Sequence, residues 1–246
     1  MKILSDIGKY FQMMGSVLSR PENWRVFRVR LFDELQNIGV NSIFLVALMS
    51  VFMGGVISLQ TAAQMTSPFL PESTVGYITQ SSTILEFSPT VISLILAGKV
   101  GSNIASEIGT MRVTEQIDAL EIMGVNSLSY LVLPKLIAAI LFFPILVTFS
   151  MTLSLIGGWF AMVISGLQTT DTYVMGIRSY FEMYYVWYAL FKTMVFGMII
   201  VTISSYFGYY TKGGSLDVGR SSTNSVVSCS VVILIANFIL TQLILF

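Results

Sequence analysis

Residues 136–170 read LIAAILFFPILVTFSMTLSLIGGWFAMVISGLQTT and contain no charged side chain. A helix needs about 20 mostly apolar residues to cross the hydrocarbon core of a bilayer. Two crossings would need about 40 residues and a turn, which this stretch cannot supply. It therefore predicts one long helix that spans a membrane and projects beyond it.

The composition of the whole chain agrees with a membrane protein. Of 246 residues, 54% are hydrophobic and only 11% are charged, whereas a soluble domain has about 25% charged residues. Lys and Arg together number 13, as do Asp and Glu, so no net charge favours nucleic acid. The chain has no His and a single Cys, which excludes imidazole chemistry and thiolate metal clusters.

Four further stretches complete the predicted spans. Residues 41–63, 193–211 and 221–246 are uncharged. Residues 83–105 contain Glu86, Pro89 and Lys99, but charges that face a bundle interior are tolerated in a span. The predicted fold class is an all-α integral membrane protein with five transmembrane helices.

The positions of Lys and Arg predict the orientation. With the N-terminus in the cytoplasm, ten of these residues lie inside and two, Arg178 and Lys192, lie outside, with Lys99 counted as intramembrane. Cytoplasmic loops carry the excess of basic residues, so the C-terminus is expected on the opposite face.

Residues 1–40 are predicted to form a separate N-terminal segment ahead of the five-helix transmembrane region 41–246. Apolar residues recur at helical spacing before Pro21 and again from Trp24 to Ile38. This pattern predicts two helices that lie in the cytoplasmic interface as an elbow. The alternative is soluble helices that pack on a partner.

The predicted cytoplasmic loop 106–128 contains a short helix. Thr114 is a suitable N-cap, Glu115 and Asp118 lie near the positive helix start, and Gly124 is a suitable stop. Ile117, Leu120 and Met123 form an apolar stripe. So short a helix must pack on something, either on its own bundle or in a groove of a cytoplasmic partner.

Two features of the second span remain ambiguous. Glu86 faces either a polar patch near the Leu85 carbonyl, which Pro89 leaves without its helical donor, or the headgroup boundary. Ala97, Gly101 and Ala105 are small residues at every fourth position, a spacing that allows close helix packing. They serve either packing within one chain or contact with a second copy.

No motif of an enzyme is present. The one Gly-Lys pair, Gly98-Lys99, is followed by Val100 rather than Ser or Thr, so it is not a phosphate-binding loop. No catalytic residue and no metal site are predicted.

The run from Glu107 to Gly124, EIGTMRVTEQIDALEIMG, resembles the signature of the MlaE (YrbE-type) permeases, the membrane subunits of ABC lipid-transport systems. The resemblance extends to Gly98–Ser102, to the Leu59-Gln60 pair and to Gly219–Val226. Relatives often have Arg-Glu-Leu-Gly-Pro where this chain has Leu85–Pro89, and Arg where it has Lys99.

The resemblance implies that two copies of the chain form a homodimer in a bacterial inner membrane and that this homodimer transports phospholipids. A separate ATPase dimer would use ATP and Mg²⁺, this chain would bind no cofactor, and an MCE-domain substrate-binding protein would lie on the periplasmic side. The residues implied to contact the ATPase are Glu107, Met111, Arg112, Glu115, Ile117, Asp118, Leu120 and Met123. Those implied at the lipid cavity are Glu86, Phe87, Leu59 and Gln60. Two other functions stay open, an ion-coupled carrier that uses Glu86 and Lys99 and a non-transporting scaffold.

Overall fold

The computed structural model describes residues 2–17, 24–65, 71–179 and 181–245. In these ranges the chain forms helices joined by short connections, without a strand. The elements, with η for π-helical segments, are α1 (Lys2–Val17), α2 (Trp24–Glu34), η1 (Leu35–Val40), α3 (Asn41–Gln64), α4 (Thr74–Ser82), η2 (Thr83–Val91), α5 (Ile92–Leu96), η3 (Ala97–Gly101), α6 (Ser102–Val113), α7 (Gln116–Ile122), α8 (Ser127–Ile164), α9 (Thr170–Arg178), α10 (Met183–Tyr209) and α11 (Ser215–Leu245).

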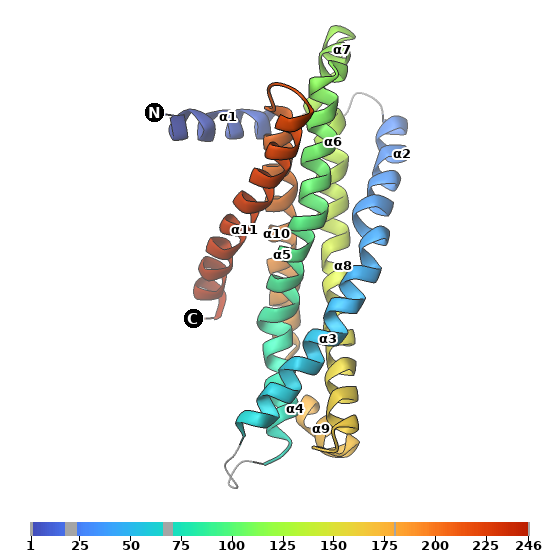
Figure 1. Ribbon diagram of the computed structural model, residues 1–246, viewed down its shortest axis with the longest axis vertical. Coiled ribbons are helices and arrows are strands. Elements are labelled where there is room, and N and C mark those ends of the chain that lie inside the picture. Colours follow the sequence, from blue (N-terminus) through green and yellow to red (C-terminus); the bar gives the residue numbers. More distant parts are fainter. Residues whose placement is uncertain (1, 18–23, 66–70, 180, 246) are drawn as a thin grey trace.

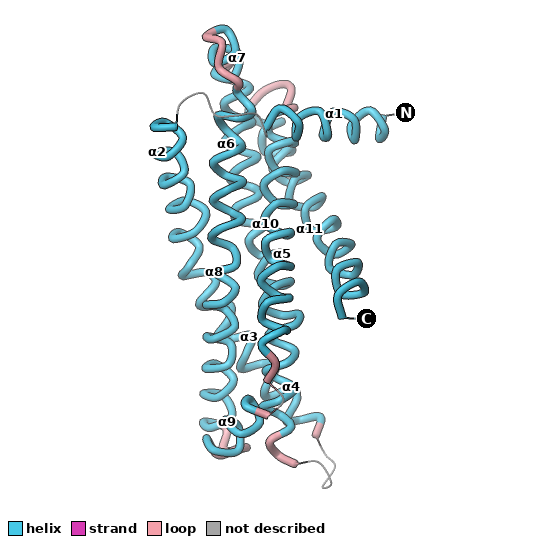
Figure 2. Tube along the Cα trace, turned by 180° about the vertical axis from the view of Figure 1, so that it is seen from behind, coloured by secondary structure: helices cyan, strands magenta, loops and turns pink. Residues whose placement is uncertain are grey.

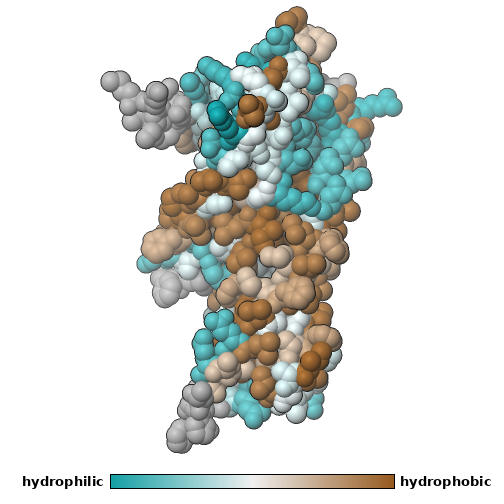
Figure 3. All heavy atoms as spheres, in the orientation of Figure 1, coloured by the Kyte–Doolittle hydropathy of each residue, from teal (hydrophilic) through white to brown (hydrophobic). Residues whose placement is uncertain are grey.

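Five stretches of the described chain are long and apolar enough to cross a membrane, which confirms the predicted fold class. They are Trp24–Gln64, Thr74–Val113, Ser127–Ile164, Met183–Tyr209 and Ser215–Ile244. They run along the long axis of the molecule, and α11 leans away from the others (Figure 1). Hydrophobic side chains cover the middle of the surface, while one end is more hydrophilic (Figure 3).

The N-terminal segment differs in part from the expected elbow. α1 lies across the long axis in both views (Figures 1 and 2), and the hydroxyl of Tyr10 donates to Thr202 Oγ1 at 2.8 Å. Residues 24–40, by contrast, continue without a break into α3 and run along the bundle. Phe27 and Ile38 are buried and hold this segment to the helices of the bundle, and its position in the membrane interface stays a prediction.

Each of the five spans begins earlier than the hydropathy pattern predicted, and in two of them the added residues include a lysine. α8 begins at Ser127 and α10 at Met183, so Lys135 and Lys192 lie inside helices rather than in loops. Each ammonium is buried against a carboxylate of another helix. A charge that is paired in this way can lie within a span, where a hydropathy rule would place a boundary.

The closest packing in the bundle joins α3 to α8. A Cβ on Gly54 would overlap the carbonyl oxygen of Ser154, and one on Gly157 would overlap the carbonyl of Val51. Glycine at both positions therefore lets the two backbones touch. Ser50 Oγ donates to Ser150 Oγ at 2.8 Å beside this crossing.

The two ends of the bundle carry different short helices. α7 stands at the end near α1, and α4 and α9 lie together at the opposite end (Figure 1). Two spans, Trp24–Gln64 and Thr74–Val113, separate α1 from α7, and so the two short helices lie at the same end. The candidate sites lie at the α7 end and inside the bundle.

Candidate functional site

The loop expected to reach a partner folds into α7, but it begins differently from the prediction. Thr114 ends α6 instead of capping α7, and its Oγ1 donates to the Thr110 carbonyl at 2.8 Å. Threonine can bond back to a carbonyl four residues earlier, and α6 extends far enough to offer one. Glu115, with φ of 60°, then turns the chain into α7.

The end of α7 agrees with the expected stop. Gly124 has φ of 81°, a left-handed conformation that glycine adopts without steric cost. The Val125 N–H donates to the Leu120 carbonyl and the Gly124 N–H to the Glu121 carbonyl, both at 3.0 Å. This pair of bonds is the Schellman motif, which satisfies the last carbonyls of a helix.

Polar contacts fasten α7 to the bundle. Arg112 Nη1 donates to Asp118 Oδ1 at 2.6 Å. The hydroxyls of Tyr209 and Ser127 both donate to Glu121 Oε1 at 2.8 Å. These two hydrogen bonds lower the pKa of Glu121, and the bond from Tyr209 has the larger effect. They do so because they favour the charged form of the carboxylate. Ile117 is fully buried beneath them.

The outer surface at the end of α7 carries two large apolar side chains that the described chain does not cover. Ile122 is 87% exposed and Met123 is 68% exposed, whereas Leu120 is half-buried. Ile117 was implied to touch the ATPase, but its burial means that it anchors α7 instead. Ile122 was missed because the apolar stripe was drawn through residues 117, 120 and 123, and the structure turns a different edge of α7 outward.

Glu107 is exposed on one side, with its side chain 43% accessible, but its carboxylate pairs with a buried lysine. Lys135 Nζ lies 2.5 Å from Glu34 Oε1 and 2.7 Å from Glu107 Oε2, and the Lys135 side chain is only 2% exposed. The three residues come from α2, α6 and α8. This cluster joins the start of the signature segment to the first and third spans.

The other residues implied at the ATPase contact lie around α7. Met111 and Arg112 are half-buried in the last turns of α6, and Glu115 is exposed at the turn. Asp118 is half-buried and paired with Arg112. Their contact with another chain stays a prediction.

Glu86 lies in a polar cluster inside the spans. Lys192 Nζ is 2.8 Å from Glu86 Oε2 and donates to the Leu85 carbonyl at 3.3 Å. Asn237 Nδ2 also donates to Glu86 Oε1, and Thr90 Oγ1 lies 3.1 Å from the same oxygen. The Lys192 side chain is fully buried, whereas that of Glu86 is 45% exposed. One edge of the carboxylate therefore remains open at the surface of the chain.

Sequence reasoning missed both Lys192 and Asn237. Lys192 was assigned to a loop, and Asn237 was one polar residue in an apolar span. A signal was available for the lysine, because residues 183–191 are largely aromatic and apolar and could extend the span in front of it. Nothing in the sequence indicates that its partner is Glu86, which precedes it by 106 residues.

The four residues implied at the lipid cavity are not gathered at one place. Phe87 lines a small cavity between η2, α3 and α8, together with Met49, Met53 and Ser150. Glu86 faces α10 and α11 instead. Leu59 and Gln60 are exposed near the end of α3.

The small residues of the second span pack within this chain. Ala97 and Ala105 are fully buried. A Cβ on Gly101 would lie 2.9 Å from Ser204 Oγ, and one on Gly208 would lie 2.8 Å from the Ala105 carbonyl. The stripe therefore lets the second span approach α10, and it is not available to a second copy.

The fold and these sites define a multi-pass, all-α membrane protein with charged clusters inside its spans and the short helix α7 standing at one end of the bundle. Comparisons with known proteins identify the family. The permease MlaE family matches residues 31–243. The chain belongs to the MlaE permease family and is an ABC transporter permease.

Similar proteins occur in bacteria and in a plant, among other organisms. A probable ABC transporter permease protein of Rickettsia bellii is 38% identical over 242 residues, covering 98% of this chain and 93% of the relative. One from Synechocystis is 33% identical over 235 residues, covering 95% and 88%. The chloroplastic protein TRIGALACTOSYLDIACYLGLYCEROL 1 of Arabidopsis thaliana is 31% identical over 238 residues, covering 94% and 65%.

Proposed function

We propose that this permease moves phospholipids between the membranes of a bacterial cell. Two copies would assemble in the inner membrane with two copies of a separate ATPase, and an MCE-domain protein would receive or deliver lipid on the periplasmic side. The family supports the permease part of this proposal. One relative carries the name of a galactolipid, trigalactosyldiacylglycerol, which favours a lipid as the transported molecule.

The observation that carries the proposal is the polar cluster around Glu86. An ionised group inside a span is costly, and it usually marks a substrate or ion pathway. The ammonium of Lys192 is fully buried, while the paired carboxylate stays partly exposed. A lipid headgroup could therefore donate to the open edge of Glu86 while its acyl chains lie against apolar side chains.

The energy for transport would come from ATP that is hydrolysed with Mg²⁺ by the partner. This chain would bind no cofactor and would receive the movement of the ATPase through α7. The exposed Ile122 and Met123 at the end of the bundle suit a hydrophobic contact of this kind. The MCE-domain protein would dock at the opposite end, near α4 and α9.

The test is lipid transfer by the complete transporter in proteoliposomes. A single Glu86→Ala substitution would leave Lys192 buried without its counter-ion, which costs about 3–5 kcal/mol, so a loss of activity could reflect loss of the fold. The double variant Glu86→Gln with Lys192→Met removes both charges together. We expect it to retain the assembled complex and basal ATP hydrolysis but to lose most lipid transfer.

Two results would contradict the proposal. Normal transfer by the double variant would show that the pair is structural. Transfer that persists without ATP and stops when an uncoupler is added would indicate an ion-coupled carrier. The matched control is Asp217→Asn, which removes a carboxylate from the loop end of α11 without touching the cluster.

A further inference from the structure

Three lysines lie inside the membrane-spanning helices, and only Lys99 lacks an acidic partner among the described residues. Lys135 is paired with two carboxylates and Lys192 with one. Lys99 Nζ instead donates to the backbone carbonyl of Asn41 across the bundle. A carbonyl carries no net charge, so the charge of Lys99 is left uncompensated by the protein.

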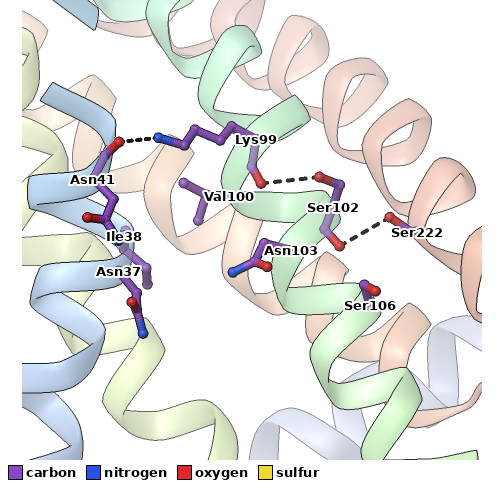
Figure 4. A pocket seen from close by; sticks show the side chains of 9 residues that line it. All are labelled: Asn37, Ile38, Asn41, Lys99, Val100, Ser102, Asn103, Ser106 and Ser222. Carbon is purple, nitrogen blue, oxygen red and sulfur yellow. Dashed lines mark hydrogen bonds between the residues drawn. The ribbon is translucent and has the colours of Figure 1, made fainter. Parts of the chain in front are cut away.

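Lys99 lines a pocket of about 580 Å³ between three segments of the chain (Figure 4). η1 and the start of α3 form one wall, η3 and α6 form the second, and Ser222 of α11 closes the third side. No acidic side chain lies among the residues that line it. The pocket therefore has a net positive charge.

The polar side chains of the pocket supply hydrogen-bond donors. Asn37 lies on one wall, and Asn103 and Ser106 lie on the other, with the amide of Asn103 directed into the space between the walls (Figure 4). The hydroxyls of Ser102 and Ser222 are already used, since they donate to the carbonyls of Gly98 and Ser102. One cation, several amide donors and no carboxylate are the composition of an anion site.

We propose that this pocket binds the phosphate group of a membrane phospholipid. Lys99 would supply the charge, and Asn103 and Asn37 would supply neutral donors to the phosphate oxygens. The surface of the molecule changes from hydrophilic to hydrophobic near the height at which α2 continues through η1 into α3 (Figures 1 and 3). A phosphate held at this height leaves its acyl chains beside the apolar part of the bundle.

The pocket is a different site from the Glu86 cluster. Glu86 and Lys99 lie thirteen residues apart on one continuous run of helix, Thr74–Val113, which places them roughly 20 Å apart at ~1.5 Å per residue. The Lys99 pocket is the one nearer to α7. The inference rests on the proposed function only in taking a phospholipid as the ligand.

The experiment measures lipid retention by the full-length protein, purified in mild detergent with the subunits that accompany it. Native mass spectrometry would compare phosphatidylglycerol with diacylglycerol of the same acyl chains, which lacks the phosphate. The background is the Glu86→Gln, Lys192→Met double variant, so that lipid held at the other cluster does not contribute. We expect more phosphatidylglycerol than diacylglycerol to remain bound to the protein.

Variants of the pocket make the test specific. Lys99→Gln should lower phosphatidylglycerol retention roughly tenfold, the typical loss of one charge-assisted hydrogen bond, and Lys99→Arg should preserve it. Asn103→Asp should also lower it, because the added carboxylate repels phosphate while Lys99 remains in place. Lys212→Gln removes a cation from an exposed loop and should change nothing.

Three outcomes would overturn the inference. The first is equal retention of diacylglycerol and phosphatidylglycerol. The second is unchanged retention in both Lys99→Gln and Asn103→Asp. The third is displacement of the lipid by millimolar inorganic phosphate to the same extent as by excess lipid, which would assign the pocket to the free anion. These retention measurements do not depend on whether the Glu86 cluster is needed for lipid transfer. The proposed function and the phosphate site can therefore fail separately.

Discussion

At the scale of single residues, the lysines inside the bundle differ in how their charge is balanced. Lys135 contacts two carboxylates and is almost completely buried. Lys192 contacts one carboxylate and the Leu85 carbonyl. A buried ion pair adds little net stability, but removal of one partner leaves an uncompensated charge. The effect of a substitution on stability therefore depends on whether it leaves a buried charge without its partner.

Lys135→Met should destabilise the protein strongly. It leaves Glu34, whose side chain is 14% exposed, and Glu107 close together without a cation. We expect a loss of about 3 kcal/mol, at the lower end of the usual range because Glu107 is partly solvated. The measurement is the thermal unfolding midpoint of the purified protein in detergent.

Glu107→Gln is the matched control for this change. It leaves Lys135 paired one-to-one with Glu34, so the unfolding midpoint should fall by much less. If the two variants are equally destabilised, the three residues do not act as one charge-balanced cluster.

At the scale of elements, α7 shows how a short helix can be held in place beyond a bundle. Seven residues are too few for a stable isolated helix. The Schellman motif at Gly124, the buried Ile117 and the hydrogen bonds to Glu121 supply the missing stability. The result is an anchored inner surface and an apolar outer surface.

Ile122→Glu should prevent the ATPase from remaining attached. Ile122 is the most exposed apolar residue of α7, and a charge placed in a buried contact costs several kcal/mol, about 3–5 if unpaired. The measurement is the amount of ATPase that co-purifies with the permease. Gln116→Glu adds the same charge at another exposed position of α7 and should leave attachment intact. If both variants co-purify with a normal amount of ATPase, the exposed surface around Ile122 does not contact the ATPase.

Acid should loosen α7 from the bundle. The hydrogen bonds from Tyr209 and Ser127 lower the pKa of Glu121 below its ordinary value of 4.5. At a pH above 4.5 the carboxylate is ionised and its hydrogen bonds stabilise the attached state of α7. This stabilisation is lost as the pH falls through the lowered pKa of Glu121. The protection of residues 116–122 from hydrogen exchange, measured relative to the intrinsic exchange rate at each pH, should be high at pH 6 and lower near pH 3.5.

Glu121→Gln separates this effect from general acid denaturation. The variant has no carboxylate to titrate, so exchange in α7 should not respond to pH beyond the response of α8. An identical pH response in wild type and variant would show that Glu121 does not control the attachment of α7.

At the scale of the whole molecule, the arrangement of charges still favours an N-terminus in the cytoplasm. Among the described residues, with the three lysines inside the spans set aside, Lys and Arg divide eight to one in favour of the end that carries α1 and α7. The single exception is Arg178 at the end of α9. This asymmetry is what the distribution of basic residues in cytoplasmic loops predicts.

Cysteine labelling in intact cells would test this orientation. In a Cys229→Ser background, a cysteine at exposed Asp171 in α9 should react with a membrane-impermeant thiol reagent added outside. A cysteine at exposed Gln116 in α7 should react only after the membrane is opened. Labelling of the second and not the first would reverse the topology.

The sequence by itself determined the features that depend on local composition. Long uncharged runs predicted four of the five helical spans, because each run must satisfy its backbone hydrogen bonds within a helix. Gly124 predicted the end of α7, because only a residue that tolerates a positive φ fits there. The signature from Glu107 to Gly124 indicated the family.

Only the tertiary structure decided which distant residues meet. The pairing of Glu86 with Lys192, and of Lys135 with Glu34 and Glu107, joins helices that are far apart in the chain. Hydropathy assigns an energy to each residue separately, so it placed both lysines outside the spans. A buried charge is tolerated because of its partner, and the partner is known only when the helices are packed together.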